Sequence, residues 1–222
     1  MHIGLIGGIG PAATTFYYRH LVRTHAEAGR RLELTLVHAD MSLLLRNMAE
    51  SKAAAQAEVF CNLTRRLQGA GADVVAITSL AGHFCVQEFE RSSLLPVVSA
   101  IPAVRDALVR RGVSRVGLIG TRVVMASRFY GGLGNIDVVV PEGDALAETD
   151  REYLTLARAG QADERCREFF ATTAQRLHAA GAEVVLLAGT DLFLAFDGDD
   201  CGVPTLDCAL THVEALTALS AA

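Results

Sequence analysis

The sequence has few of the residues that mark cross-linked, zinc-binding or nucleic-acid-binding proteins. Its 222 residues include five cysteines, an odd number, and no two of them stand in a Cys-x-x-Cys pair. This usage argues against a disulfide framework and a structural zinc site, and it is typical of a protein of the reducing cytoplasm. The net charge of −5 supplies no basic excess. We therefore expect no nucleic-acid partner.

Long apolar runs are also absent. No uninterrupted apolar stretch reaches the roughly 20 residues that span a bilayer. The first ten residues have no basic region and run directly into a glycine-rich turn, unlike a secretion signal. We expect no membrane partner and a cytoplasmic protein. Apolar residues nevertheless make up 51% of the chain, which is enough to bury a sizeable core.

What the sequence does contain is an internal repeat. Segments of the first half return in the second half in the same order, at offsets of 113, 110 and 108 residues. A duplicated half of this length predicts two similar lobes with a cleft between them. The paired segments are residues 4–7 with 117–120, 70–75 with 180–185, and 95–97 with 203–205.

Short apolar runs alternate with longer amphipathic stretches, and this pattern predicts an α/β fold with parallel sheets. The expected strands are residues 3–6, 33–38, 74–78, 97–98, 116–119, 138–140, 184–187 and 205–206. The expected helices are residues 11–28, 52–70, 82–90, 101–111, 123–133, 145–159, 163–180 and 208–221. Residues 197–200, Asp-Gly-Asp-Asp, are expected to form a surface loop without a metal, because they lack the spacing of a calcium loop.

A glycine-rich turn, Gly7-Gly8-Ile9-Gly10, follows the first expected strand and opens a helix. Its backbone N–H groups predict an anion site for a carboxylate or a phosphate, formed by Gly8, Ile9 and Gly10. The same glycines satisfy a loose dinucleotide fingerprint, with Asp40 as the acid for the ribose. A tight turn that binds nothing is the remaining alternative.

Two further turns follow expected strands at equivalent places in the repeat. Ser79-Leu80-Ala81-Gly82-His83 follows the third strand, and Gly189-Thr190-Asp191 follows its counterpart. Ligands of parallel α/β sheets bind beyond the carboxyl ends of strands. We therefore expect these turns to carry the chemistry.

These motifs together resemble the cofactor-independent aspartate/glutamate racemase family over nearly the whole chain. The resemblance rests on the opening glycine turn and Tyr17-Tyr18, on residues 118–125 (Leu-Ile-Gly-Thr-Arg-x-x-Met) with Phe129-Tyr130, and on Asp207 with His212. The broad-specificity amino-acid racemases are the most similar branch. The resemblance implies two pseudo-symmetric parallel-sheet lobes around an active-site cleft, no pyridoxal phosphate, a small acidic substrate and a homodimer. It also implies that the last helix returns to the first lobe, so we expect lobes of residues 1–97 with 207–222 and 98–206.

The sequence departs from this family where the resemblance places the two catalytic cysteines. Ser79 stands at the first position, where only the following His83 matches the family motif, and Gly189 stands at the second. Glycine has no side chain to carry a proton, so racemisation by two thiols is not available. His83, Ser79, Asp191 and Cys208 are the side chains left as candidates for proton transfer, and a thiol at a helix start such as Cys208 has a lowered pKa.

Other residues are candidates for binding the substrate. Arg46, Lys52 and Arg122 are candidates for a distal carboxylate, and Thr121 and Ser127 for hydroxyl donors near the start of the second half's first helix. Together with Gly189 and Thr190 they complete the expected site. Each of these cations also fits solvated surface, and Cys208 also fits a buried structural thiol.

The sequence therefore predicts an enzyme that acts on a small amino or carboxylic acid by acid–base chemistry without cysteine, as an isomerase, lyase or cyclase. Two alternatives stay open. One is an inactive homologue that still binds a small acid, and the other is a dinucleotide-dependent enzyme.

Overall fold

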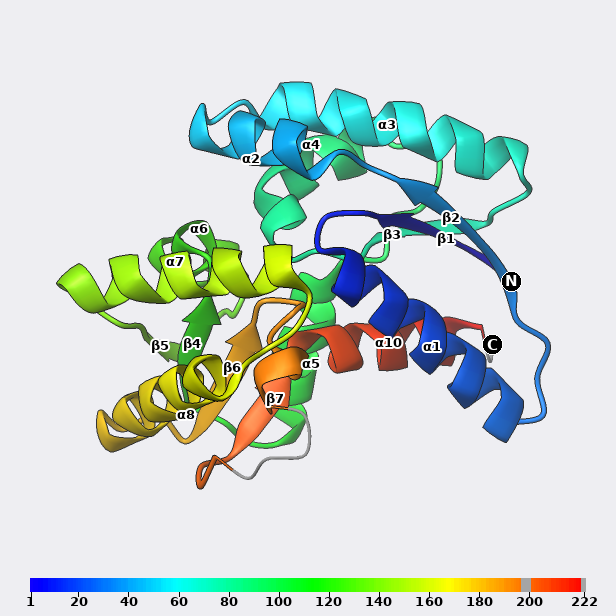
Figure 1. Cartoon of the computed structure of the whole chain (residues 1–222). Helices are drawn as coiled ribbons and strands as arrows, with labels where there is room; N and C mark the ends of the chain where they lie inside the picture. Colours follow the sequence, from blue (N-terminus) through cyan, green and yellow to red (C-terminus); the bar gives the residue numbers. More distant parts are fainter. Residues whose placement is uncertain (197–200, 221–222) are drawn as a thin grey trace. The chain divides into compact units, whose positions relative to one another are not determined.

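The computed structural model describes residues 1–196 and 201–220, so the predicted loop at 197–200 lies outside the described residues. Internal contacts divide the chain into two compact units, one of Met1–Ser99 with His212–Ala222 and one of Ala100–Thr211. Each unit is an α/β structure with its own parallel sheet (Figure 1). The predicted fold class is therefore confirmed.

The sheet of the first unit has the strand order β2-β1-β3, and all of its pairs are parallel. Its strands are β1 (His2–Gly7), β2 (Glu33–His38) and β3 (Val74–Ile77). The central strand β1 pairs on both sides, and its residues from Ile3 to Gly7 are buried. The strand expected at 97–98 is a single bridge between Val75 and Val97, because the chain there makes only two hydrogen bonds with β3 before turning away.

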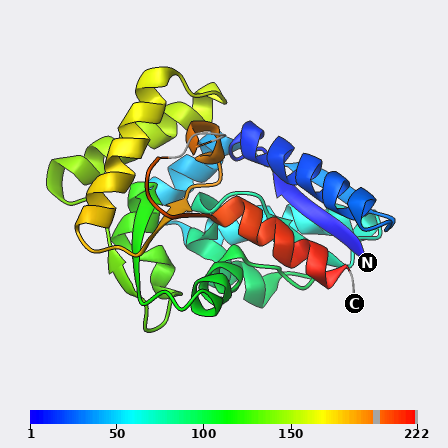
Figure 2. The ribbon, with the colours of Figure 1, turned by 90° about the horizontal axis from the view of Figure 1, so that it is seen from below.

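Helices cover both faces of this sheet. The helices of the first unit are α1 (Pro11–Glu27), α2 (Met41–Ala49), α3 (Ala53–Gly69), the 3₁₀ turn η1 (Ala81–Cys85), α4 (Val86–Ser92) and, from His212 onward, α10 (Cys208–Leu219). Figure 2 shows α1 and α10 side by side. Hydrogen bonds between Thr24 and Thr217 and between His25 and Ser220 join them, so the last helix is fixed to the first unit.

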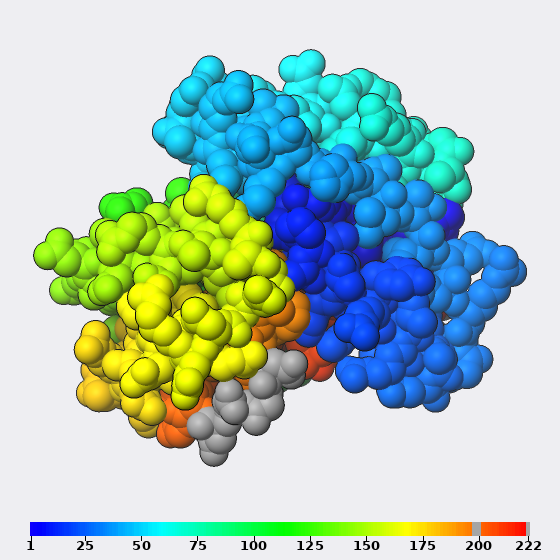
Figure 3. Space-filling model, viewed as in Figure 1, coloured from blue at the N-terminus to red at the C-terminus, as the bar shows by residue number. Residues whose placement is uncertain are grey.

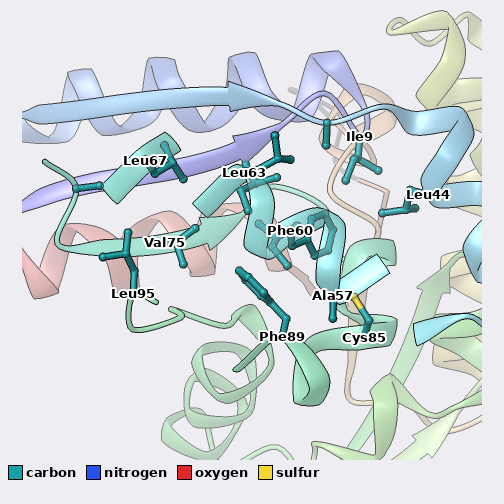
Figure 4. Close-up of a cluster of buried hydrophobic side chains, with 14 residues drawn as sticks. Ile9, Leu44, Ala57, Phe60, Leu63, Leu67, Val75, Cys85, Phe89 and Leu95 are labelled. Atoms are coloured by element: carbon teal, nitrogen blue, oxygen red, sulfur yellow. The ribbon is translucent and has the colours of Figure 1, made fainter. Parts of the chain in front are cut away.

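The core of the first unit lies between its sheet and the pair α3 and α4 (Figure 4). Phe60 of α3 and Phe89 of α4 meet edge to face, with ring centroids 5.5 Å apart. Leu67, Val75 and Cys85 belong to the same buried cluster. Such a packed layer fixes the position of β3, whose end carries Ser79.

The second unit repeats this plan with one more strand. Its sheet has the order β5-β4-β6-β7, again parallel, with β4 (Arg115–Gly120), β5 (Asp137–Val139), β6 (Val184–Ala188) and β7 (Thr205–Asp207). The order β5-β4-β6 corresponds to β2-β1-β3, and β7 lies beside β6 as Val97 lies beside β3. The sequence repeat is therefore a repeat of structure.

The helices of the second unit are α5 (Ala100–Arg110), α6 (Arg122–Ala126), the 3₁₀ turn η2 (Phe129–Gly131), α7 (Gly143–Ala159), α8 (Glu164–Ala179) and α9 (Phe193–Phe196). The long helices α7 and α8 form much of the surface of this unit in the view of Figure 3. The inner face of α7 buries Thr149, Tyr153, Leu156 and Ala157. This face brings the Tyr153 side chain into the unit.

Several helices differ from the sequence-based expectation. Helices α2 and α9 were not predicted. Asp40 is the N-cap of α2, with Oδ1 accepting the Leu43 N–H at 2.9 Å. The role of Asp40 as a ribose-binding acid is therefore not supported. The helix expected over residues 123–133 ends at Ala126.

A left-handed turn replaces the rest of that helix. Arg128, Phe129, Tyr130 and Gly131 all have positive φ, between 50° and 67°. Only Gly131 lacks the Cβ that makes this conformation unfavourable, at roughly 1–2 kcal/mol for each ordinary residue. The turn is held by hydrogen bonds to Ser127, whose hydroxyl accepts the Tyr130 N–H at 2.9 Å. Backbone strain of this kind is typical of functional regions.

We expect Arg128→Gly to raise the free energy of unfolding by about 1 kcal/mol, because glycine adopts this backbone conformation without a Cβ penalty. Arg105→Gly is the matched control, since Arg105 is exposed in the right-handed helix α5, where glycine costs about 1 kcal/mol. Urea unfolding of both variants measures the two effects. Loss of stability in both variants would contradict the strain at Arg128.

Candidate active site

The expected site residues of the first unit lie at the carboxyl ends of β1 and β3. Gly8 and Gly10 have φ of 91° and 82°, which ordinary residues rarely adopt. A Cβ on Gly8 would lie 2.6 Å from the Ala39 oxygen and closer still to the ring of His38. The turn therefore requires glycine because it packs directly against the end of β2.

A threonine pair stabilises this turn from inside. The Gly8 N–H donates to Thr14 Oγ1 at 2.9 Å, and that hydroxyl lies 3.1 Å from Thr78 Oγ1. The backbone donor of Gly8, which we expected to bind a substrate anion, is thus used within the protein. The Ile9 side chain is buried in the core, so only the backbone of this residue is left to contact a ligand. Thr14 and Thr78 were not predicted, because both read as ordinary helix and strand residues.

His83 is the central polar group of this edge. It lies in η1 with 2% of its surface exposed, and its Nδ1 is 2.8 Å from the Ser79 carbonyl oxygen. A carbonyl only accepts hydrogen bonds, so Nδ1 carries the proton and Nε2 holds the lone pair. Burial lowers the pKa of His83 to about 4, against the opposing effect of the bond to Ser79. The ring is therefore neutral at pH 7 and its Nε2 is a base.

Ser79 itself is buried. Its hydroxyl accepts the Gly82 N–H at 3.4 Å, while His83 bonds to its backbone oxygen. Ser79 therefore orients the imidazole through its carbonyl.

A second buried imidazole lies beside His83. His212 of α10 has Nε2 at 2.9 Å from the Val98 oxygen, so Nε2 donates, and Nδ1 accepts the Tyr17 hydroxyl at 2.9 Å. The rings of His83 and His212 are perpendicular, with centroids 6.2 Å apart. Burial, and then the neighbouring His83, lower the pKa of His212 to about 3. The sequence marked His212 and Tyr17 only through the family resemblance.

The expected residues of the second unit follow β4, β6 and β7. Gly189 follows β6, and a Cβ built on it would lie 2.7 Å from Tyr153 Cζ and closer still to Cε2. The Tyr153 ring, delivered by α7, therefore fills the volume that a side chain at position 189 would occupy. Nothing local in the sequence marked Tyr153.

Polar groups surround this ring. The Tyr153 hydroxyl donates to Asp191 Oδ2 at 3.3 Å, and both residues are buried. Burial, then the charges of Asp191 and Cys208, raise the pKa of Tyr153 well above its usual value. Thr190 is 1% exposed, and a hydrogen bond between its side chain and that of Tyr153 opposes part of the rise in the Tyr153 pKa.

The expectation of a lowered pKa at Cys208 is wrong. Its side chain is fully buried at the start of α10. Burial raises the thiol pKa well above its usual value, and the nearby Asp207 and Asp191 raise it further. The helix terminus does not offset this loss of hydration and the two acidic neighbours. Cys208 is therefore a protonated thiol at neutral pH.

The candidate cations are on the surface. Arg46 is exposed in the last turn of α2. Lys52 pairs with Glu50, and Arg122 pairs with Asp150. Thr121 caps α6 by accepting the Val124 N–H at 3.4 Å. Ser127 holds the left-handed turn rather than a ligand.

The residues that the structure describes fit neither pyridoxal phosphate nor a metal site. Lys52 is the single lysine of the sequence, and it is exposed and ion-paired, whereas pyridoxal phosphate requires a lysine for its Schiff base. Among the described residues, no group of His, Cys, Asp and Glu is arranged to hold a metal ion. In the same part of the chain, no helix is both long and apolar enough to cross a membrane.

Comparisons with known proteins agree on one group. The model of the Asp/Glu/hydantoin racemase family matches residues 6–216. A candidate Asp/Glu racemase from Yersinia pestis is 24% identical with a TM-score of 0.85, covering 100% of both chains. An aspartate racemase homologue from Pyrococcus horikoshii OT3 is 27% identical with a TM-score of 0.81, covering 100% of this chain and 99% of its own. A glutamate racemase from Francisella tularensis, solved with D-glutamate, is 14% identical with a TM-score of 0.67, and the match covers 98% of this chain and 80% of that one.

Proposed function

Because this chain belongs to the Asp/Glu/hydantoin racemase family, we propose that it is an enzyme that acts on a small amino or carboxylic acid by acid–base chemistry without pyridoxal phosphate. The observation that carries this proposal is the arrangement of His83. Its imidazole is buried at the carboxyl end of β3, fixed in one tautomer and neutral at pH 7. A family member without a thiol at either expected position still holds a base at this edge.

His83 Nε2 is the base that removes a proton from the carbon next to a carboxylate. The hydrogen bond from Nδ1 to the Ser79 carbonyl orients the ring and partly stabilises the imidazolium that forms. The low pKa keeps the base available in nearly every molecule at neutral pH, at some cost in proton affinity. Ser79 and His212 act through the position of this ring and the packing around it.

The reaction class follows from what the two turns lack. The resemblance places the two thiols of a racemase at positions 79 and 189, which are serine and glycine here. An isomerase, lyase or cyclase that uses unlike acid and base groups fits these residues better than a symmetrical two-thiol racemase. Gly189, Thr190 and Asp191 are proposed to contact the substrate in the second unit, and Ile9, Gly10, Arg46 and Thr121 stay candidates for binding its carboxylates.

We expect His83→Gln to reduce the rate of α-proton exchange by 100-fold or more, because glutamine keeps a hydrogen bond to Ser79 but has no basic nitrogen. The measurement is NMR of L-aspartate, L-glutamate and succinate in deuterated water with excess enzyme. His178→Gln is the matched control, since His178 is exposed on α8. Exchange by the wild type should persist from pH 8 to pH 5 and fall near pH 4 as His83 is protonated. Full activity of His83→Gln would overturn its role as the base.

The same experiment decides between the enzyme and its main alternative. A former racemase that only binds a small acid would show binding by calorimetry and no exchange with any of the three acids. A dinucleotide-dependent enzyme has less support, because Asp40 caps α2 and Gly8 bonds to Thr14. Failure to bind NAD or NADP in calorimetry would remove it.

The family also suggests an assembly and a location. A homodimer in the cytoplasm is proposed on the resemblance and on the cysteine usage of the chain. Sedimentation of the purified protein at micromolar concentration tests the dimer.

A further inference from the structure

Tyr17 and His212, which the family resemblance singled out, form a buried chain of hydrogen bonds beside His83. The Tyr17 hydroxyl donates to His212 Nδ1 at 2.9 Å, and His212 Nε2 donates to the Val98 carbonyl at 2.9 Å. All of these residues belong to the first unit. We propose that Tyr17, acting through His212, is a positioning residue that holds the His83 ring in place as the base. This inference rests on the proposed function and adds Tyr17 to it.

The two hydrogen bonds fix the His212 ring. A carbonyl oxygen only accepts, so Nε2 carries the proton and Nδ1 is left to accept the Tyr17 hydroxyl. A flip of the ring would put carbon atoms in both places, and the bonds to Tyr17 and to Val98 would be lost. Tyr17 and His212 are both fully buried, so water does not replace the bond between them. The ring therefore stays in one orientation and one tautomer.

The fixed ring lies against His83. The two imidazoles are perpendicular, at 77°, with centroids 6.2 Å apart, within the range of about 4.5–7 Å in which edge-to-face rings attract each other. Both nitrogens of His212 are engaged elsewhere, so it meets His83 as a ring and exchanges no proton with it. It is also uncharged, because the bond accepted at Nδ1 stabilises the neutral form and burial disfavours the cation. His83 thus has a fixed neighbour that does not repel the imidazolium formed when His83 takes a proton.

The chain of bonds also reaches the strand that leads to His83. The Val98 N–H donates to the Val75 carbonyl of β3 at 2.8 Å. The turn after β3 carries Ser79, whose carbonyl orients the His83 ring. Loss of the Tyr17 hydroxyl is therefore expected to loosen the base without removing it.

Tyr17→Phe tests this role, because it keeps the ring and removes only the hydroxyl that donates to His212. We expect kcat for α-proton exchange to fall by about 10- to 100-fold, with KM within about twofold, because the base is present but less well oriented. The probes are L-aspartate, L-glutamate and succinate in deuterated water. All rates are measured at a temperature at which each variant is folded by circular dichroism.

Ser220→Ala is the matched control. The Ser220 hydroxyl bonds to His25 at 2.7 Å and joins the same two segments of the chain as the bond from Tyr17 to His212, at the other end of their contact. Both variants should lower the Tm, because each removes one hydrogen bond of this contact. Ser220→Ala should nevertheless keep the exchange rate of the wild type. An equal fall in kcat in both variants would reduce the effect to stability and would overturn the positioning role of Tyr17.

The remaining outcomes separate this inference from the proposed function. Exchange by the wild type with an equal kcat in Tyr17→Phe overturns the role of Tyr17 and leaves the proposed function standing. A rise in KM with unchanged kcat would assign Tyr17 to substrate binding, and would also overturn the inference. Absence of exchange by the wild type with all three acids overturns the proposed function and the positioning of its base together.

A second measurement reads the rings directly and needs no substrate. ¹⁵N labelling of the seven histidines gives resonances that single His→Gln variants assign. In Tyr17→Phe the ring nitrogens of His83 and His212 should shift or broaden, whereas those of the exposed His178 should keep their positions. His83 resonances that match those of the wild type would show that the ring keeps its place without the Tyr17 hydroxyl, and would overturn the inference.

Discussion

Gly189→Ala is expected to lower the free energy of unfolding by about 3 kcal/mol, the upper part of the range for overpacked cores. The added methyl would lie 2.7 Å from Tyr153 Cζ and closer to Cε2. The ring is 4% exposed and is held by its bond to Asp191, so it has little room to retreat. Urea or thermal unfolding measures the loss.

Two matched variants identify the cause. Gly69→Ala adds the same methyl to the last residue of α3, where a Cβ meets nothing within 4 Å, and should stabilise the protein by about 0.5–1 kcal/mol. In a Tyr153→Ala background, Gly189→Ala should lose most of its cost, because the ring it strikes is gone. An equal cost in both backgrounds would show that the ring is not the obstacle.

As the pH falls, this protein should lose stability at a higher pH than a protein without buried imidazoles. The pKa values of His83 and His212 are lowered to about 4 and about 3, whereas free histidine in the unfolded chain titrates near 6.5. Below pH 6.5 the unfolded chain thus binds two protons that the folded protein refuses. Each pH unit then removes about 1.4 kcal/mol per imidazole, or about 3 kcal/mol for the pair. The loss from His83 ends near pH 4 and that from His212 near pH 3.

His83→Gln separates this effect from the general titration of carboxylates. Its unfolding free energy, measured by urea at several pH values, should fall between pH 6.5 and 4 with a slope about 1.4 kcal/mol per unit shallower than that of the wild type. Parallel curves for His83→Gln and the wild type would mean that His83 is not buried neutral.

The repeat predicted the architecture because it consists of short apolar segments that can be recognised in the sequence alone. The apolar runs 3–6, 116–119 and 184–187 lie within β1, β4 and β6, and the paired segments 70–75 and 180–185 lead into β3 and β6. The missed helix α2 has as its N-cap Asp40, which was expected to bind a ribose. An acid after a strand has the same local sequence whether it caps a short helix or binds a ligand. The packing of Leu44 in the core, which the local sequence does not reveal, distinguishes the two cases.

The site was harder to predict because its decisive facts are tertiary. Ser79, His83 and Asp191 follow strands, so their position could be predicted, but the bond of His83 to a carbonyl instead of a hydroxyl could not. The pKa of Cys208 was predicted in the wrong direction, since the helix terminus is visible in the sequence and the burial is not. Tyr153 lies 36 residues before Gly189 in an ordinary amphipathic helix, and only the fold joins them.

The ring above Gly189 also restricts the order in which this protein can change. The Cβ of a cysteine introduced at position 189 alone would clash with the Tyr153 ring. This clash destabilises the single mutant whatever chemistry its sulfur could perform. The substitution becomes accessible once residue 153 is small. A path toward a thiol at this position, in evolution or in engineering, therefore passes through position 153 first.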